Sequence, residues 1–379
     1  MRILLLNYEY PPVGGGAATA TREIARALRR LGHAPVVLTA RFGELPERAD
    51  EDGVTVVRLP CRRLRPDAAS LGEMASYFAA AWPAVGPLVR QERIGAMLAF
   101  FSLPCGPLAW RAHRGTGIPY VVSLRGGDVP GNEPGLRFAH ALLAPVRRRV
   151  LRGAAAVIAN SPGLRALAEA ADGVPVRVIP NGVDPAFFRP AAPAPHSPAP
   201  LRLLFVGRFH PQKNLPWLLR QLADFAGELP ASFTLDLVGE GPRLPELRTL
   251  AAELGLQDRL RWRGWVPRSE LPALYQGADV VLHPTLYEGM PNVLLEAMAC
   301  GVAVVASDVP GNDAVVRPGE TGFLHPLDDG AAFRSILRRL VAEPGLAPAL
   351  GAAGRRAVER DFSWERTAQS YLELLLPAV

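Results

Sequence analysis

Short apolar runs recur along the first half of the chain and alternate with segments whose apolar residues follow a helical period. The runs lie at 2–7, 35–39, 54–59, 94–100, 119–124, 154–160 and 176–180. Runs of strand length separated by helices are typical of parallel β-strands joined by crossover helices. The first half is therefore predicted to form an α/β domain around a parallel sheet.

The same alternation returns in the second half of the chain. Its predicted strands lie at 201–206, 233–238, 259–264, 279–283 and 302–306, with helices after Asn214 and at 291–299. Residues 185–200 between the two series are rich in proline and alanine and lack apolar periodicity, as expected of a semi-rigid linker. The pattern predicts two doubly wound domains at 1–184 and 201–362, followed by an amphipathic helix within 363–379.

Residues that directly follow predicted strands are the candidates for chemistry, because open α/β sheets bind ligands beyond the carboxyl ends of their strands. Two facing domains of this kind would place those ends across a shared cleft. Gly14, Gly15 and Gly16 follow the first strand and precede a helical pattern. They either let the backbone approach a ligand closely or form a tight turn.

Length and composition agree with two packed domains, since 379 residues exceed the ~100–200 typical of one domain and 49% of them are hydrophobic. The apolar run Ile3–Leu6 is too short for a signal peptide, and the uncharged stretch 74–89 falls short of the ~20 residues of a spanning helix. No transmembrane segment is predicted. Three cysteines without CxxC spacing favour a reducing cytoplasm.

Charge is distributed unevenly along the chain. Residues 1–190 carry 24 basic and 15 acidic side chains, a net charge of +9, whereas residues 191–379 carry 18 and 21, a net charge of −3. A basic first half either attracts an anionic acceptor or membrane surface, or is a solvated arginine-rich face. Nucleic acid is not favoured as a partner, because no recognition motif accompanies the charge.

The segment GRFHPQKN at 207–214 lies between the first strand of the second domain and a helix. Arg208 and Lys213 would flank the helix N-terminus, where backbone amides and the helix dipole favour a phosphate. Lys213 is the only lysine among 42 basic residues, which indicates a need for a compact point charge there. The alternative is a chance surface lysine.

A second candidate segment, TLYEGMPNVLLEAMACG at 285–301, runs from a strand end through a glycine turn into a helix. Glu288 in the loop and Glu296 about one turn into the helix would both face the ligand side, where they accept hydrogen bonds from sugar and ribose hydroxyls. A carboxylate in such a turn also serves as a helix cap.

Together these segments resemble the retaining glycosyltransferases of family four, which have the GT-B fold of two Rossmann-like domains. The likeness rests on GRFHPQKN, on LVGEGP at 237–242 and on E(x7)E at 288–296. YPPVGGGAATA near the N-terminus and IPNGVD at 179–184 resemble the same family, so the likeness covers nearly the whole chain.

The resemblance implies a role for each motif residue. Arg208 and Lys213 would bind the donor diphosphate, Glu288 the hydroxyls of the transferred sugar and Glu296 the ribose. Further donor contacts are expected from the glycine turns, the loop beside the nucleobase and the start of the helix, at Gly15, Gly16, Gly207, Val266, Gly289, Met290, Pro291, Asn292 and Val293. The helix within 363–379 would cross back to the first domain; packing within the second domain is the alternative.

The chain departs from the family within SLRGGD at 123–128. Many relatives have His-Gly-x-Asp there, with the histidine near the reacting sugar, and Arg125 stands in its place. Arg125 would then supply a permanent cation, with Asp128 orienting it or the acceptor. A structural ion pair between Arg125 and Asp128 is the alternative. The expected catalytic set is Glu288, Arg208, Lys213, Arg125 and Asp128.

No metal or other cofactor is predicted. The histidines other than those in the motifs lack ligand spacing and are expected to be solvated or satisfied: His113, His140, His196, His283 and His325. Asp328-Asp329 is adjacent rather than DxD and is interpreted as a helix cap. The cations at the phosphate site would replace a divalent ion.

The resemblance thus implies a metal-independent, retaining enzyme of hexosyltransferase type that takes sugar from a UDP- or GDP-sugar. The acceptor would be a sugar, a lipid-linked molecule or a small molecule, in polysaccharide, glycolipid or cell-envelope biosynthesis. The cluster Arg147-Arg148-Arg149-Arg152 and the stretch 74–89 suggest peripheral association with the inner face of the cell membrane. The rivals are a nucleotide-sugar epimerase, a sugar phosphorylase and a non-catalytic nucleotide-sugar-binding protein.

Overall fold

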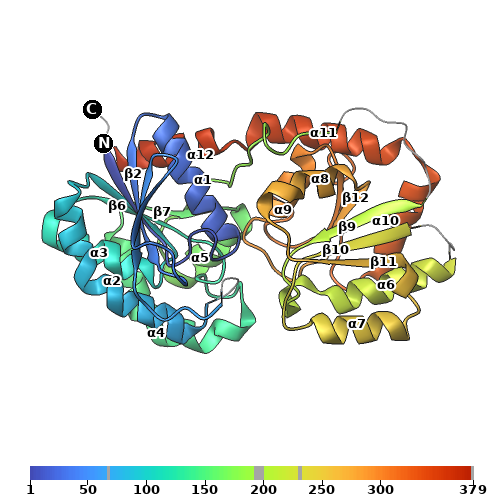
Figure 1. The fold of residues 1–379 in the computed structure, drawn as a ribbon, viewed down its shortest axis with the longest axis horizontal. Coiled ribbons are helices and arrows are strands. Elements are labelled where there is room, and N and C mark those ends of the chain that lie inside the picture. Colours follow the sequence, from blue (N-terminus) through green and yellow to red (C-terminus); the bar gives the residue numbers. More distant parts are fainter. Residues whose placement is uncertain (66–68, 192–199, 229–232, 377–379) are drawn as a thin grey trace. The chain divides into compact units, whose positions relative to one another are not determined.

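Each of the two units of the chain is built around one sheet of mainly parallel strands, with helices packed on it (Figure 1). The first unit comprises Met1–Gly182 and Trp364–Val379, and the second comprises Val183–Ser363. The structure, a computed structural model, describes residues 1–65, 69–191, 200–228 and 233–376. The predicted α/β class is confirmed.

The sheet of the first unit has the order β3-β4-β2-β1-β5-β6-β7-β8, and only β3 and β4 pair antiparallel. Its strands are β1 (Arg2–Leu6), β2 (Ala34–Ala40), β3 (Arg48–Glu51), β4 (Val54–Leu59), β5 (Ala96–Phe100), β6 (Tyr120–Ser123), β7 (Ala156–Ala159) and β8 (Arg177–Val178). The central strands β5 and β6 are buried throughout. Such strands read as continuous apolar runs because both faces are covered.

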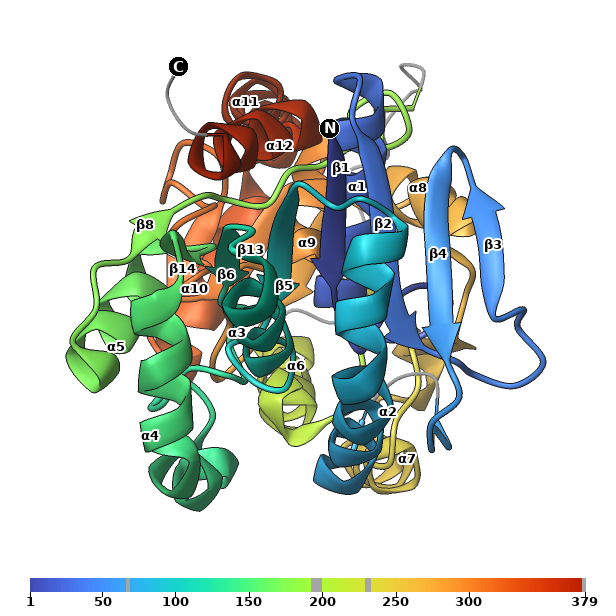
Figure 2. The same cartoon turned by 90° about the vertical axis from the view of Figure 1, so that its left-hand side faces the viewer.

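Helices from both ends of the chain cover this sheet (Figure 2). They are α1 (Gly16–Arg30), α2 (Leu71–Gln91), α3 (Cys105–Thr116), η1 (Pro134–Leu136), α4 (Arg137–Gly153), α5 (Pro162–Asp172) and α12 (Trp364–Leu375). The C-terminal α12 packs against α1, and Trp364, Ala368 and Tyr371 join the apolar core of the first unit. Among the described residues, no helix combines the length and the apolar character needed to cross a membrane.

The second sheet is parallel throughout, in the order β11-β10-β9-β12-β13-β14. Its strands are β9 (Leu201–Val206), β10 (Phe233–Val238), β11 (Leu260–Gly264), β12 (Val280–His283), β13 (Ala303–Ser307) and β14 (Phe323–His325). Successive residues of a strand face opposite sides, so Leu203 and Phe205 enter one apolar core and Leu204 and Val206 another.

One of these cores lies against α6 (Leu215–Glu228), α7 (Leu244–Glu253) and α10 (Gly330–Ala342). The other lies against α8 (Leu271–Gln276), α9 (Asn292–Ala299) and α11 (Leu346–Asp361). Short 3-10 turns occupy η2 (Pro211–Lys213), η3 (Gln257–Arg259) and η4 (Arg268–Glu270). Both faces of the second sheet are thus covered by helices, as the alternation predicted.

The predicted linker at 185–200 differs from the structure at its beginning. The second unit already starts at Val183, and Phe188 is fully buried in its core, with its ring centroid 5.9 Å from that of Tyr275. Residues 192–199 lie outside the described residues, as do residues 377–379 of the predicted last helix. The short strand β3 was not predicted because its sequence, RADE, has no apolar pattern.

A buried ion pair fastens α4 to the end of α5, which corrects the view of Arg147 as part of a surface cluster. Arg147 and Asp172 have side chains 3% and 2% exposed. The guanidinium approaches both carboxylate oxygens, with Nε 2.9 Å from Oδ2 and Nη2 2.9 Å from Oδ1. Removing one partner of such a pair leaves an uncompensated buried charge.

Asp172→Ala is therefore expected to lower the free energy of unfolding by about 3–5 kcal/mol, measured by urea denaturation. Arg148→Ala is the control, because the Arg148 side chain is 47% exposed and its loss is expected to cost less than about 1 kcal/mol. Equal effects of the two substitutions would contradict a structural role for the buried pair.

Candidate functional site

Two loops lie side by side at the carboxyl edge of the second sheet because they follow the neighbouring strands β9 and β12. The phosphate loop, 207–214, leads to α6, and the carboxylate loop, 284–291, leads to α9. Gln212 joins them. The side-chain Nε2 of Gln212 donates to the backbone carbonyl of Tyr287 at 2.8 Å. The backbone carbonyl of Gln212 accepts from the backbone amide of Leu286 at 2.9 Å.

Lys213 of the phosphate loop and Glu288 of the carboxylate loop form a direct ion pair. The ammonium group donates to Glu288 Oε1. The two side chains are only 13% and 11% exposed, so the charges are mostly shielded from water. Two residues predicted separately from two motifs are therefore each other's partners in the structure.

His283, the last residue of β12, supplies a second partner for the Glu288 carboxylate. Its Nε2 lies 3.2 Å from Oε1, and its side chain is 1% exposed. Burial lowers the pKa of His283, so the imidazole is neutral at pH 7 and its Nε2 proton is donated to the carboxylate. Its Nδ1 is buried without a hydrogen-bond partner among the described residues. A histidine expected to be only satisfied or solvated thus belongs to the candidate site.

These contacts keep Glu288 ionised. Burial raises the pKa of Glu288, but the charge of Lys213 and the hydrogen bond from His283 outweigh it, and the pKa falls from its ordinary value of 4.5 to about 2. The carboxylate is therefore an anionic hydrogen-bond acceptor at any physiological pH and is poorly suited to act as a general acid.

A layer of buried polar side chains that the sequence did not single out supports the carboxylate loop. The Ser307 hydroxyl donates to the Thr285 carbonyl, and Asn312 Nδ2 donates to the Ser307 carbonyl at 2.9 Å. All three residues are fully buried. Gly311 has a φ of +99°, and a Cβ there would lie 2.6 Å from the Gly289 carbonyl oxygen. This position therefore requires glycine.

Glu296 lies about one turn into α9, as predicted, and its carboxylate already has partners. The Tyr275 hydroxyl donates to Oε2 at 2.9 Å, and the Arg268 guanidinium lies 3.5 Å from Oε1. Met290 and Val266 belong to the apolar cluster on this face of the sheet. The binding of a ribose by Glu296 and of a base beside Val266 stays a prediction.

The remaining predicted donor residues of the second unit lie on the same two loops or at the start of α9. Gly289 and Pro291 are buried, whereas Asn292 and Val293 are partly exposed. Arg208 is exposed. Gly239 of the LVGEGP motif packs so tightly on the phosphate loop that a Cβ would lie 2.0 Å from the Gly207 carbonyl oxygen.

In the first unit, Gly15 and Gly16 lie where α1 begins, after β1 and its glycine turn. Gly14 has a φ of +98°, and a Cβ there would lie 2.6 Å from Glu9 Cβ. The tight-turn interpretation is therefore correct for Gly14. A Cβ at Gly15 would meet nothing within 4 Å, and close approach to a ligand by Gly15 and Gly16 stays a prediction.

Arg125 anchors other parts of the first unit. Its Nη1 donates to Asn181 Oδ1 at 2.7 Å, its Nη2 to the Tyr371 hydroxyl at 3.3 Å, and its guanidinium carbon lies 4.6 Å from the centroid of the Phe100 ring. Arg125 thereby joins the end of β6 to the IPNGVD segment and to α12. Within the first unit this is the environment of a structural residue.

Asp128 is not hydrogen-bonded to the Arg125 guanidinium, which corrects the alternative of a structural ion pair between their side chains. Its carboxylate instead accepts from the backbone amides of Ser102 at 2.6 Å, of Arg125 at 2.8 Å and of Gly126 at 3.2 Å. Asp128 thus fixes the backbone of the loop that carries Arg125.

The described residues contain no group of three or more histidine, cysteine or acidic side chains arranged to hold a metal ion. His196 lies outside them. Asp329 accepts from the Ala332 amide at 2.9 Å at the start of α10, so its interpretation as a helix cap is confirmed.

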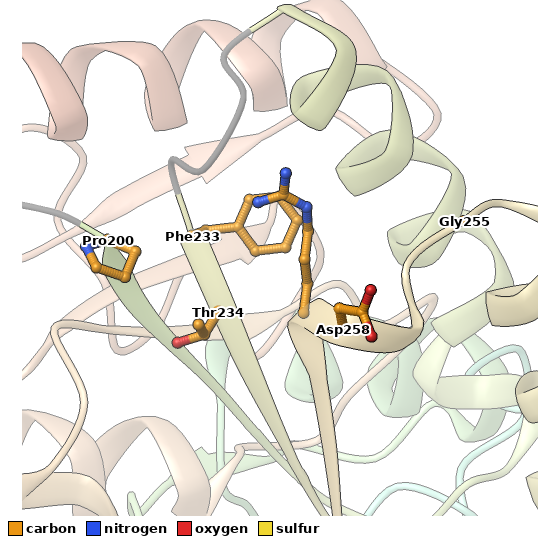
Figure 3. Close-up of a pocket in the computed structure, with 6 residues that line it drawn as sticks. Pro200, Phe233, Thr234, Gly255 and Asp258 are labelled. Atoms are coloured by element: carbon orange, nitrogen blue, oxygen red, sulfur yellow. The ribbon is translucent and has the colours of Figure 1, made fainter.

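A pocket of about 370 Å³ lies at the opposite edge of the second sheet from the two loops (Figure 3). Its lining includes Pro200, directly before β9, and Phe233, the first residue of β10. Because parallel strands run from this edge toward the loops, the pocket is not part of the candidate site.

Comparison with known proteins finds matches over most of the chain. Residues 15–182 match the family described as glycosyl transferase 4-like domain, and residues 200–343 match glycosyl transferases group 1. The chain is 30% identical to 2-deoxystreptamine glucosyltransferase of Streptomyces kanamyceticus, over 91% of this chain and 95% of that protein.

Two solved structures extend the comparison. Sucrose-phosphate synthase from Thermosynechococcus elongatus has a TM-score of 0.83 and 25% identity, over 99% of this chain and 98% of its own. Anabaena HepE, solved with UDP and glucose, has a TM-score of 0.78 at 22% identity over the full length of both chains, a likeness of fold.

The Lys213–Glu288 pair leads to a pH-dependent prediction. In the wild type the ionised carboxylate stabilises the folded state above pH 4.5, and this contribution is lost as the pH falls toward 2. Without Lys213, the effect of burial on the pKa of Glu288 is no longer offset by its strongest opposing charge. Lys213→Ala is therefore expected to lower the free energy of unfolding by about 2 kcal/mol at pH 7 and by less at pH 4, measured by urea denaturation.

Arg338→Ala is the matched control. Arg338 forms an exposed ion pair with Glu228, with side chains 48% and 34% exposed, so little effect is expected at either pH. A loss of stability by Lys213→Ala that is the same at pH 4 and pH 7 would show that the cation does not hold Glu288 ionised.

Proposed function

Since this chain belongs to the family-four glycosyltransferases and has their GT-B fold, we propose that it is a retaining, metal-independent member of that family. It is a glycosyltransferase that uses a nucleotide-sugar donor. The proposed donor is a UDP- or GDP-sugar, and the proposed acceptor group is a hydroxyl. The observation that carries the proposal is the shielded Lys213–Glu288 pair between the two motif loops.

The pair suggests how the site changes when the donor binds. Without donor, the ammonium group of Lys213 is paired with the carboxylate of Glu288. We propose that the donor diphosphate draws the ammonium group away, with Arg208 and the N-terminus of α9 as further positive groups. Glu288 then accepts hydrogen bonds from hydroxyls of the sugar, while His283 keeps the carboxylate in position. Glu296 would receive the ribose and Val266 the base.

In the proposed reaction the bond between the anomeric carbon and the diphosphate oxygen breaks, and the acceptor oxygen bonds to that carbon on the same face. The acceptor proton passes to the departing phosphate oxygen, so the step needs no enzyme nucleophile. Lys213 and Arg208 stabilise the negative charge that develops on the diphosphate, the role a divalent ion has elsewhere. Glu288 positions the sugar and favours positive charge at its ring.

Arg125 and Asp128, which were expected to be catalytic, are proposed here to position other residues. Their contacts within the first unit support positioning roles, in which Asp128 shapes the loop and Arg125 ties it to Asn181 and α12. Gly15 and Gly16 are proposed to approach the donor phosphate or the acceptor. The free cysteines Cys61, Cys105 and Cys300 support a reducing cytoplasm as the proposed compartment.

A thermal-shift screen of UDP, GDP and their sugar conjugates in the presence of EDTA tests the donor site. One nucleotide series is expected to raise the melting temperature of the wild type, because a ligand that binds only the folded state stabilises it by mass action. Lys213→Ala should abolish the shift, and Arg338→Ala should retain it.

Shifts that appear only with a divalent ion, or that survive Lys213→Ala unchanged, would refute the metal-independent site. Product formation without an acceptor alcohol would favour an epimerase, and dependence on inorganic phosphate would favour a phosphorylase.

A further inference from the structure

Helix α4, whose course is shown in Figure 2, carries a stripe of large apolar side chains that are exposed. Phe138, Leu142 and Val146 are 82%, 69% and 48% exposed, and their spacing of four residues places them on one face of the helix. Leu143 beside them is 41% exposed. We call these four residues the α4 stripe.

The stripe is not the face that holds α4 in the fold. That face carries His140, Arg147 and Leu151, which are buried. Since α4 is anchored through Arg147 and Asp172, the stripe, whose side chains are 41–82% exposed, lies largely outside the packing of this unit. A contiguous exposed apolar surface with polar neighbours is typical of an interaction site.

The chain around the stripe is strongly basic. Residues 93–168 contain ten arginines and only two acidic residues, Asp128 and Glu133, and Asp128 is buried. On the surface of α3 and α4 this leaves several exposed arginines: Arg111, Arg114, Arg137, Arg148, Arg149 and Arg152. Positive charge beside an apolar stripe is complementary to a surface that is anionic outside and apolar beneath.

We propose that the α4 stripe binds an anionic membrane surface. Phe138, Leu142 and Val146 would enter the boundary between headgroups and acyl chains, while the arginines contact anionic headgroups. The surface differs in part from the one that the sequence suggested, because Arg147 is buried and the whole of 74–89 lies in α2, whose Tyr77 and Val85 belong to the core.

The α4 stripe lies close in sequence to the loop that contains Asp128. Helix α4 begins at Arg137, shortly after the loop that follows β6 and contains Asp128. A membrane held by α4 would bring lipid-linked hydroxyl acceptors toward that loop. This last step rests on the proposed transferase function, whereas membrane binding itself does not.

Co-sedimentation with vesicles tests the proposal. Full-length protein is mixed with vesicles of phosphatidylcholine alone or with phosphatidylglycerol added, at low and high salt. Binding is expected only to the anionic vesicles and to weaken with salt. Phe138→Asp with Leu142→Asp should reduce partitioning at least about tenfold, because two apolar contacts are lost and two like charges are added to the lipid.

The matched control is Leu64→Asp with Leu71→Asp, since these side chains are 67% and 60% exposed in the same unit and receive the same charge change. It should bind like the wild type after correction for its added charge, and both variants should keep the nucleotide-dependent thermal shift, which reports the donor site separately. Equal losses in both double variants, or no binding by the wild type, would overturn the proposal. So would conversion of a dimer to a monomer by the α4 variant alone, which would assign the stripe to a second copy of the chain.

Discussion

The negative charge of Glu288 is the constraint on which the candidate site depends. A carboxylate that is only 11% exposed is costly unless charged and hydrogen-bonding partners replace its water. Lys213 and His283 supply those partners from two different segments. Both must be held firmly, and the contacts of Gln212 and the buried Ser307 and Asn312 do this by fixing the loops relative to the sheet.

This arrangement also gives the site a resting state. Lys213 and Glu288 are bound to each other in the structure. In the function proposed above, donor binding is an exchange of partners, in which the diphosphate replaces the carboxylate at Lys213 and sugar hydroxyls replace the ammonium group at Glu288. In this proposal His283 is the contact that persists, because its Nε2 lies 3.2 Å from Glu288 Oε1 and donates to the carboxylate independently of Lys213.

The sequence predicted the loops and the charged residues of the site because parallel strands bring their carboxyl ends to one edge. That rule places the two motif loops at one edge of the sheet, but the direct contact between Lys213 and Glu288 was not predicted. The rule does not predict the supporting contacts. Gln212 and Tyr287 are 75 residues apart in the sequence, and Arg125 and Tyr371 are 246 residues apart. Such contacts depend on packing that has no local period. One feature of the sequence could have identified His283 as a site residue: it is the final residue of a buried strand and directly precedes the carboxylate loop.

The exchange of partners is tested most directly by calorimetric titration of wild type and Glu288→Gln with a nucleoside diphosphate and with its sugar conjugate, in EDTA. Glutamine removes the anion that competes for Lys213 but keeps much of the shape. The account predicts that Glu288→Gln binds the nucleoside diphosphate more tightly than the wild type, by about tenfold, and loses affinity for the sugar part of the conjugate. Equal weakening of both ligands, or no change in either, would contradict the exchange of Lys213 between Glu288 and the diphosphate.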